Sequence, residues 1–595
     1  MKSFQGVSFV IFIYYSGVVF IGCDTQVQTV TARHHDTPDF LTEATSASVT
    51  ETPSTISVTT EKTAKEKEDE LRYKSVTGKE SAKHWKNLAQ SNLRERQRIR
   101  PIEKVAKNII YFVGDGMSVP TVAGARIFKG QSEGLHFGEE AQLHMETFPF
   151  LGASKTFCSD AQVADSACSA TALFTGSKTN IKTIGVTPDV SVGDCFQQMQ
   201  PENQLSSILE WAQKEGKSTG IVTTTRITHA TPAGCYSRIA HRDWENDVEI
   251  TKAGQDPEKC DDIAEQLILR EPGRNINVIL GGGRKHLLPS TEVDFESKQN
   301  GSRNDSKNLI EMWKAAHANQ TSQYVDRVET LLNVDTKNLD YLLGLFAPDH
   351  IEYSDNITTN HDPTLLNMTT IAIRILSKNP NGFFLMVEGG RIDHALHENF
   401  GKRALLEAVE FDSAIARADE MTDDDDTLIT VTSDHSHVMS IAGYPIRGNP
   451  ILAVAENSDI DGLPYTTISF ANGPGFRNQT SNGLRPNVSE DDLMKIDYRQ
   501  FAGLPSKYET HGGDDVFIFS KGPYAHYLTG VNLQNYIPHV MAYAACIGPA
   551  GMEQSPLCNE IRSTSASARL TNLNISLQLV LLAALSANRI ICSFL

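Results

Sequence analysis

The chain has 595 residues, and its 54 Lys and Arg residues against 73 Asp and Glu residues give a formal net charge of −19. This charge argues against a nucleic-acid-binding protein, which needs basic surfaces to displace counterions. With 40% hydrophobic and 21% charged residues, the composition excludes a wholly disordered chain. The length allows several domains or one large α/β enzyme domain, and nine cysteines allow a few structural disulfides.

The N-terminus begins with a targeting segment. Residues 7–22 form an apolar run that is short for a transmembrane helix. We interpret residues 1–22 as a secretory signal peptide that is cleaved near Gly22 or Cys23. A signal anchor is the alternative, and a bacterial lipoprotein signal is a weaker one. Residues 23–80 are rich in Ser, Thr and Glu, and this composition predicts a disordered arm.

The C-terminus has the pattern of a lipid-attachment signal. Residues 563–595 contain a run of small residues, a short polar spacer and an apolar tail. This order predicts a GPI-attachment signal that is removed after the anchor is joined at Ser563 or Ser565. A C-terminal transmembrane helix is the alternative. Both place the protein on the extracellular face of the cell membrane.

The interior of the chain also indicates an extracellular protein. Single Asn-x-Ser/Thr sequons arise by chance, but a cluster in a chain with a signal peptide predicts a glycoprotein. Such sequons begin at Asn300, Asn304, Asn319, Asn356, Asn367, Asn478 and Asn487. They also disfavour the bacterial lipoprotein signal.

The ordered part begins near residue 81, with a helix whose apolar stripe is Trp85, Leu88 and Leu93. Short apolar runs then alternate with helical patterns, which predicts an α/β fold with a mainly parallel central sheet and helices on both faces. The predicted strands are 108–113, 218–223, 276–280, 382–387, 427–432 and 515–519, and the clearest helices are 203–215, 363–378 and 400–420. The domain spans 81–562, and residues 443–510 interrupt it as an irregular insertion.

Polar residues follow several of the predicted strands. Ligands of such sheets bind at the carboxyl ends of the strands, so we expect Asp115, Glu388, Asp434 and His435 to converge there. Asp393 and His397 have helical i, i+4 spacing, which places both on one helix face. Carboxylates and imidazoles gathered in this way predict a metal site.

A run of small residues at 165–172, DSACSATA, predicts the start of a helix with Asp165 as its cap. An anion at Ser166 would be stabilised by the field of the helix N-terminus. Taken alone, the small residues would be better explained by close helix packing.

These motifs together resemble the alkaline phosphatase family, specifically its GPI-anchored animal branch. FVGDGMS, DSACSATA, TTTRITHATPAG, FFLMVEGGRIDHALHE and TVTSDHSHV occur in the family's order, and the resemblance runs from about Trp85 to Cys558. It implies an alkaline-phosphatase-like fold with a small crown at 443–510. It further implies a homodimer that hydrolyses phosphate monoesters at alkaline pH through a phosphoserine intermediate.

The resemblance also assigns site residues and cofactors, namely two Zn²⁺ and one Mg²⁺. Ser166 matches the nucleophile, which also contacts metal, and Arg242 matches the phosphate-binding arginine, while His229 matches a residue beside the magnesium. The implied ligands are Asp393, His397 and His511 for one zinc, Asp115, Asp434 and His435 for the other, and Asp115, Thr231 and Glu388 for magnesium.

The chain departs from the family pattern in its cysteines. Cys168 and Ser169 replace the Gly-Thr of vertebrate members beside the nucleophile, and we expect activity to survive this change because neither is a ligand. The resemblance implies two disulfides, Cys195–Cys260 and Cys546–Cys558. Cys158, Cys168 and Cys235 remain, as one further disulfide with a free thiol or as three thiols.

A calcium site of animal members is only partly retained. Matching by position implies Glu292, the carbonyl of Phe346 and Asp362, but Ala347 stands where the family has a second glutamate. Because calcium affinity rises with carboxylate charge, we expect weak or absent calcium binding.

Two other functions compete with a phosphomonoesterase. A phosphodiesterase can share the two-zinc core but lacks the magnesium elements found in TTTRITHATPAG and EGGRIDH. A surface receptor that has lost catalysis is disfavoured because every expected metal ligand is present.

Overall fold

The structure is a computed structural model that describes residues 80–135, 137–357, 362–549 and 558–559. The predicted signal peptide, all but the last residue of the predicted arm, and the predicted GPI signal lie outside these ranges. None of the helices described has the length and the apolar composition that a membrane-spanning segment needs.

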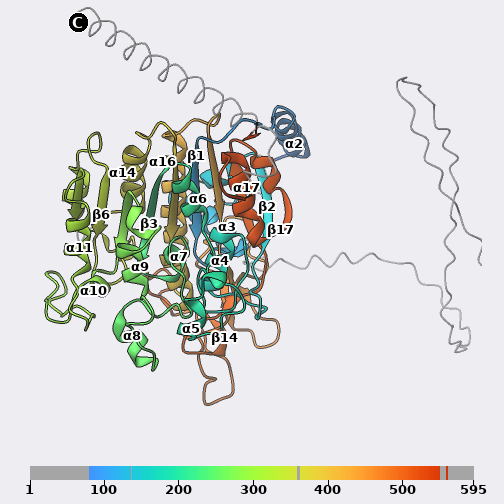
Figure 1. Cartoon of the computed structure of the whole chain (residues 1–595). Helices are drawn as coiled ribbons and strands as arrows, with labels where there is room; N and C mark the ends of the chain where they lie inside the picture. Colours follow the sequence, from blue (N-terminus) through green and yellow to red (C-terminus); the bar gives the residue numbers. More distant parts are fainter. Residues whose placement is uncertain (1–79, 136, 358–361, 550–557, 560–595) are drawn as a thin grey trace, which may run out of the picture. The chain divides into compact units, whose positions relative to one another are not determined.

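A ten-stranded sheet forms the centre of the molecule (Figure 1). Only β16 runs antiparallel to its neighbours, and every other neighbouring pair is parallel, which confirms the predicted mainly parallel sheet. From one edge to the other the strands are β17 (Gly530–Leu533), β2 (Phe150–Lys155), β16 (Val516–Lys521), β8 (Thr427–Thr432), β1 (Asn108–Gly114), β7 (Phe383–Gly389), β3 (Ser218–Arg226), β4 (Val278–Gly282), β6 (Tyr341–Leu345) and β5 (Ser322–Val325).

Both faces of the sheet are covered, which explains why its central strands are apolar throughout. Successive side chains of β1 alternate between two hydrophobic cores: Ile109, Tyr111 and Val113 belong to one, and Ile110 and Phe112 to the other. The first core includes residues of α4 (Ser166–Thr175), α6 (Ile208–Lys214), α9 (Ile263–Leu269) and α17 (Ile537–Ala545). The second includes residues of α3 (Val119–Ser132), α14 (Leu365–Leu376) and α16 (Gly401–Glu420).

The first helix described, α2 (Ala82–Arg96), differs from the expectation in its burial. Ser81 caps it by accepting a hydrogen bond from the backbone of His84, so the predicted helix is correct. Its apolar stripe is not a core face, because Trp85, Leu88 and Leu93 are 46%, 45% and 59% exposed. Helical periodicity therefore located the helix but did not predict whether the domain covers it.

The insertion at 443–510 is more regular than expected, because it contributes to two small sheets. Its strands are β11 (Val454–Asn457), β12 (Pro464–Thr466), β13 (Ile468–Gly473) and β14 (Ala502–Pro505), and β13 also pairs with β10 (Met439–Ile441) just before it. The two ends of the insertion meet where β9 (Ser436–His437) pairs antiparallel with β15 (His511–Gly512). This pairing returns His511 to a position opposite His437, beyond the end of β8.

Three disulfides are formed in the described residues. Cys195–Cys260 and Cys546–Cys558 confirm the two predicted pairs. Cys158 and Cys168 form the third bond, and Cys235 is a buried free thiol. Of the two alternatives left by the sequence, one further disulfide with a free thiol is therefore correct.

A buried carboxyl on α16 fastens the loop that follows β6. Glu407 is 7% exposed, and its Oε1 accepts hydrogen bonds from the backbone nitrogen (2.6 Å) and the hydroxyl (2.8 Å) of Ser354. Burial raises the pKa of Glu407 to about 7, although both hydrogen bonds from Ser354 act against this change. The folded chain thus holds a proton that the unfolded chain has already lost at neutral pH.

We therefore expect the wild type to lose stability as the pH rises from the unfolded pKa of Glu407, 4.5, through about 7. Glu407→Gln cannot ionise and retains the oxygen that accepts from Ser354. Relative to wild type, it should gain about 1–3 kcal/mol of unfolding free energy between pH 5 and pH 9. Denaturant unfolding at both pH values measures this, with Glu420→Gln on the exposed end of the helix as control. An equal effect at both pH values would contradict the assignment.

Candidate active site

The candidate site lies where four neighbouring strands, β8, β1, β7 and β3, reach their carboxyl ends. Asp434 and His435 follow β8, Asp115 follows β1, and Glu388 lies at the end of β7. The short helix α15 (Arg391–His397) comes next and carries both Asp393 and His397. Parallel neighbours thus bring side chains from distant parts of the sequence to one edge, as predicted.

The first group of candidate ligands contains Asp393, His397 and His511, the three residues predicted for one zinc. His511 Nε2 lies 3.1 Å from His397 Nε2 and 3.5 Å from Asp393 Oδ1. The other nitrogen of each imidazole donates a hydrogen bond to a backbone carbonyl: His397 Nδ1 to Glu509 (2.6 Å) and His511 Nδ1 to Ala164 (2.8 Å). Such hydrogen bonds fix the ring and leave Nε2 free for a metal.

The first group has a fourth member, His437, which the sequence did not single out. Its Nε2 lies 2.6 Å from Asp393 Oδ1, and its Nδ1 bonds to the buried carboxylate of Glu509. Burial opposes a charge here, but Glu509 and Asp393 outweigh it and raise the pKa of His437 to about 10. The contact from His437 Nε2 orients the carboxylate of Asp393. Each residue had a local signal in the sequence: His437 belongs to the DHSH motif, and Glu509 lies two residues before His511.

Gly116 makes room for His437. Its φ is +67°, and a Cβ at this position would lie 2.4 Å from the His437 ring. The turn in FVGDGMS therefore needs glycine both for its backbone conformation and for this contact.

The second group consists of Asp115, Asp434 and His435, and all three are fully buried. His435 Nε2 lies 3.4 Å from Asp115 Oδ1 and 3.2 Å from Asp434 Oδ2. Among the described residues, neither carboxylate oxygen of Asp115 accepts a hydrogen bond of good geometry. Burial, reinforced by the charges of Asp434, Asp393 and Glu388, raises the pKa of Asp115 well above its usual value. A carboxylate in these surroundings fits a cation.

The third group contains Asp115, Glu388 and His229. Glu388 Oε2 accepts hydrogen bonds from Thr223 and from Thr225 (3.1 Å), and burial raises the pKa of Glu388 to about 7. Its Oε1 and the hydroxyl of Thr231 are buried and make no hydrogen bond of good geometry in the described chain, although the nearby Thr231 hydroxyl acts, like Thr223 and Thr225, to lower the pKa of Glu388. The oxygens without such a hydrogen bond are thus those of Asp115, Thr231 and Glu388, the three ligands predicted for magnesium, and magnesium prefers oxygen ligands. His229 belongs to this group by distance, although the sequence analysis placed it outside the ligand set.

The candidate nucleophile lies beside the second group. Ser166 is the first residue of α4, and Asp165 caps the helix by accepting from the Cys168 backbone nitrogen. Ser166 Oγ is 3.2 Å from His435 Nε2. Arg242 Nη1 donates to Asp165 Oδ2 at 3.2 Å, which fixes the guanidinium to the residue that precedes the serine.

The residues proposed for calcium differ in their burial. Asp362 is buried, and burial together with the charges of Glu296 and Glu352 raises its pKa to about 6. Glu292 is exposed instead and accepts a hydrogen bond from Asn308 (2.8 Å). The charges that act on Asp362 are thus those of Glu296 and Glu352, whereas the matched Glu292 is exposed.

Comparisons with known proteins agree on one family. The alkaline phosphatase family model matches residues 106–547. The tissue-nonspecific alkaline phosphatase of Felis catus is 48% identical over 475 residues, which cover 78% of this chain and 89% of the cat protein. The membrane-bound alkaline phosphatase of Bombyx mori is 45% identical over 475 residues, which cover 79% of this chain and 86% of the silkworm protein.

Solved structures show the same fold at low identity. Alkaline phosphatase from the Antarctic bacterium TAB5 aligns with a TM-score of 0.51 and 22% identity, over 75% of this chain and all of the bacterial one. The Thermus thermophilus enzyme aligns with a TM-score of 0.52 and 21% identity, over 76% of this chain and 93% of that one. A TAB5 variant with Mg bound in its M3 site aligns with a TM-score of 0.52 and 22% identity, over 75% of this chain and all of that one.

The sheet and the three ligand groups define a class of protein, an α/β enzyme with candidate metal sites at the carboxyl ends of parallel strands. The family match and the relatives narrow this class. The chain belongs to the alkaline phosphatase family and is a phosphate-monoester hydrolase.

Proposed function

We propose that this alkaline phosphatase is a metal-dependent enzyme of the extracellular cell surface, which hydrolyses phosphate monoesters at alkaline pH through a phosphoserine at Ser166. The observation that carries the proposal is the set of buried oxygens on Asp115, Thr231 and Glu388 that make no hydrogen bond of good geometry among the described residues. This set lies beside a helix-capped serine that is 3.2 Å from His435. Structural proteins rarely leave buried carboxylates without partners.

The donor sets favour two Zn²⁺ and one Mg²⁺. Mixed imidazole and carboxylate ligands suit zinc, and oxygen ligands suit magnesium. Asp393, His397 and His511 would hold one zinc, Asp115, Asp434 and His435 the second, and Asp115, Thr231 and Glu388 the magnesium. When bound, these ions would neutralise the phosphate charge and favour ionisation of hydroxyl groups, so that activity rises with pH.

The chain's own residues bind the phosphate and make the covalent bond. Ser166 Oγ attacks phosphorus, the alcohol leaves, and a phosphoserine forms at the N-terminus of α4, where the helix field stabilises negative charge. Water then attacks phosphorus, and the bond between phosphorus and Ser166 Oγ breaks. This step releases inorganic phosphate and restores the serine hydroxyl. Arg242 offers a planar pair of N–H donors to phosphate oxygens, and Asp165 keeps that guanidinium in place.

Hydrolysis of p-nitrophenyl phosphate against bis-p-nitrophenyl phosphate tests the reaction class. A bound diester has no free dianionic phosphate for Arg242, so kcat/KM should favour the monoester by at least about 100-fold. A preference for the diester would replace this proposal with a phosphodiesterase. No turnover of either substrate in metal-loaded protein would favour a receptor that has lost catalysis.

Membrane attachment through a GPI anchor is supported by the pattern of residues 563–595 and by membrane-bound relatives. Phosphatidylinositol-specific phospholipase C should release most activity from intact cells, leaving a new C-terminus at Ser563 or Ser565. Activity that remains on cells after this treatment, but dissolves in detergent, would instead indicate a retained helix. Sedimentation of the released form should give the mass of a homodimer.

Calcium should bind weakly or not at all, because Ala347 removes one carboxylate and Glu292 faces solvent. Ala347→Glu should lower the calcium dissociation constant by about tenfold, since each carboxylate adds charge to such a site. Calorimetric titration of both proteins measures this. Equal and tight binding by wild type would show that other oxygens complete the site.

A further inference from the structure

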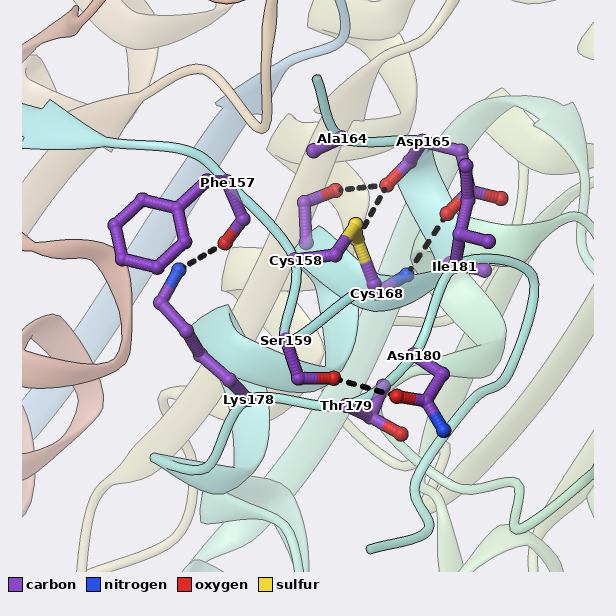
Figure 2. Close-up of a disulfide and its surroundings, with 12 residues drawn as sticks. Phe157, Cys158, Ser159, Ala164, Asp165, Cys168, Lys178, Thr179, Asn180 and Ile181 are labelled. Carbon is purple, nitrogen blue, oxygen red and sulfur yellow. Dashed lines mark hydrogen bonds between the residues drawn. A yellow bond between two sulfur atoms is a disulfide. The ribbon is translucent and has the colours of Figure 1, made fainter. Parts of the chain in front are cut away.

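A disulfide encloses the segment that leads to the nucleophile (Figure 2). Cys158 lies just beyond β2, and Cys168 lies in the first turn of α4, with 5.7 Å between their Cα atoms. The closed loop, residues 158–168, contains Ala164, Asp165 and Ser166. The ring is therefore placed directly against the candidate active site.

Few other apolar contacts anchor this loop. Cys158, Ala164 and Cys168 form a small buried cluster of their own, separate from the two main cores, with Ala161 and Ile181 packed against it. Val163 is 39% exposed, and Ser159 and Gln162 are exposed as well. Hydrogen bonds also tie the loop to residues 179–182: the Ser159 nitrogen donates to the Thr179 carbonyl (3.0 Å), and the Ile181 and Lys182 nitrogens donate to the carboxylates of Asp160 (2.9 Å) and Asp165 (3.1 Å). Because little apolar area of the loop is removed from water, the covalent bond adds to these polar contacts as a further constraint.

The loop contacts two groups of the site that are distant in sequence. The carbonyl of Ala164 accepts the hydrogen bond from His511 Nδ1 (2.8 Å), which leaves His511 Nε2 facing Asp393 and His397. The carboxylate of Asp165 accepts from Arg242 Nη1 (3.2 Å). Displacement of the loop would move a candidate zinc ligand, the phosphate-binding arginine and the nucleophile together.

The other two disulfides are less directly connected to the site: the segment of Cys195 reaches Arg242 through Ala240, which accepts from the Gly193 nitrogen (3.0 Å) and donates to Gln198 Oε1 (2.8 Å). Cys195 begins the short helix α5 (Cys195–Gln198) and bonds to Cys260, which precedes α9. Cys546 follows α17. Among the described residues, neither Cys195 nor Cys260 hydrogen-bonds to a residue of the three ligand groups, to Ser166 or to Arg242.

We propose that the Cys158–Cys168 disulfide is a positioning element of the active site. It holds the Ala164 carbonyl against His511 and the Asp165 carboxylate against Arg242, and neither sulfur touches substrate. The inference rests on the proposed function, because it assigns His511 to a metal site and Arg242 to phosphate. The helix cap made by Asp165 is local to α4, so α4 persists without the disulfide while the loop before it gains freedom.

The test compares two double variants in secreted, metal-loaded protein: Cys158→Ser/Cys168→Ser and the matched control Cys195→Ser/Cys260→Ser. The first should raise the inhibition constant of inorganic phosphate and lower kcat, each by about tenfold, because small displacements of positioned groups are costly. It should also lose zinc at about tenfold lower chelator concentration, since hydrogen bonds that orient a metal ligand affect metal affinity. The control should lower the melting temperature but leave all three values within about twofold of wild type.

Several outcomes would overturn the proposal. Unchanged phosphate inhibition, kcat and zinc retention in the first variant would show that the loop is held without the disulfide. Equal losses in both variants would indicate a purely structural role. If Cys158→Ser/Cys168→Ser does not fold, Cys158→Ala/Cys168→Ala replaces it, because alanine keeps the apolar contacts with Ala164. If neither variant folds, the disulfide has a structural role and the proposal fails. Absence of phosphomonoesterase activity in wild type would instead defeat the proposed function, and zinc retention would still report on the loop.

Discussion

Ser166→Ala should abolish the phosphoenzyme and lower kcat by about 10³- to 10⁶-fold, the range seen when a covalent nucleophile is removed. Folding should be unaffected, because the cap of α4 belongs to Asp165, and alanine is favourable at the first helical position. Acid quenching during turnover followed by peptide mass spectrometry should find a phosphoserine at Ser166 in wild type and none in the variant.

Ser169→Ala is a suitable control for this experiment, since it removes a hydroxyl from the same helix. Ser169 Oγ bonds to the Asp165 carbonyl (2.8 Å) and to Asp434 Oδ2 (3.3 Å), so it supports a candidate ligand but makes no bond to phosphorus. We expect about a tenfold loss of kcat with the phosphoserine retained. A phosphoserine found elsewhere in the chain would contradict the role of Ser166.

The central strands could be predicted because burial on both faces leaves an unbroken apolar run. The pattern of residues 108–113 matches β1, whose side chains are all buried, and the polar residues after it mark the edge of the sheet. The same reasoning placed Asp115, Glu388 and Asp434 together, since parallel neighbours end on one side. Local pattern and sheet geometry therefore placed these residues, whereas His511, Thr231 and Arg242 were assigned only through the family resemblance.

The strands β2, β17, β5 and β6 were not predicted. β17 and β2 at one edge have mostly exposed or half-buried residues, and β5 at the other edge has only Val325 buried. β6 is largely buried but is interrupted by Gly344, which weakens its pattern. Strands that are held by pairing with a neighbour carry little periodic signal of their own.

Contacts between distant segments of the chain were the second feature that could not be predicted from the sequence. Nothing local in the sequence joins His437 to Glu509, and the pair becomes visible only when β9 and β15 lie side by side. The choice among Cys158, Cys168 and Cys235 was open for the same reason, because spacing does not report which thiols approach each other. The departure at Cys168 is thus explained by its bond to Cys158.

Asp115 allows a test of the metal groups that does not rely on activity alone. It belongs to both the second and the third group, and neither of its oxygens accepts a hydrogen bond of good geometry in the described chain. Asp115→Asn should lose magnesium and one zinc, and kcat should fall by about 10³-fold or more, because it removes charge from two sites at once. Metal analysis after gel filtration and steady-state kinetics measure both effects.

The difference in stability between wild type and Asp115→Asn should change sign when the metals are removed. With metals bound, wild type should be more stable than Asp115→Asn, since ions that bind only the folded state stabilise it. After chelation at pH 9, the order should reverse by about 1–3 kcal/mol, because burial and the charges of Asp434 and Asp393, which raise the pKa of Asp115, then act on an uncompensated carboxylate. Asp425→Asn, an exposed change, should show no such crossing. A wild type that stays more stable than Asp115→Asn after chelation would mean that the carboxylate is stabilised by the protein itself, and that the cluster is not built around cations.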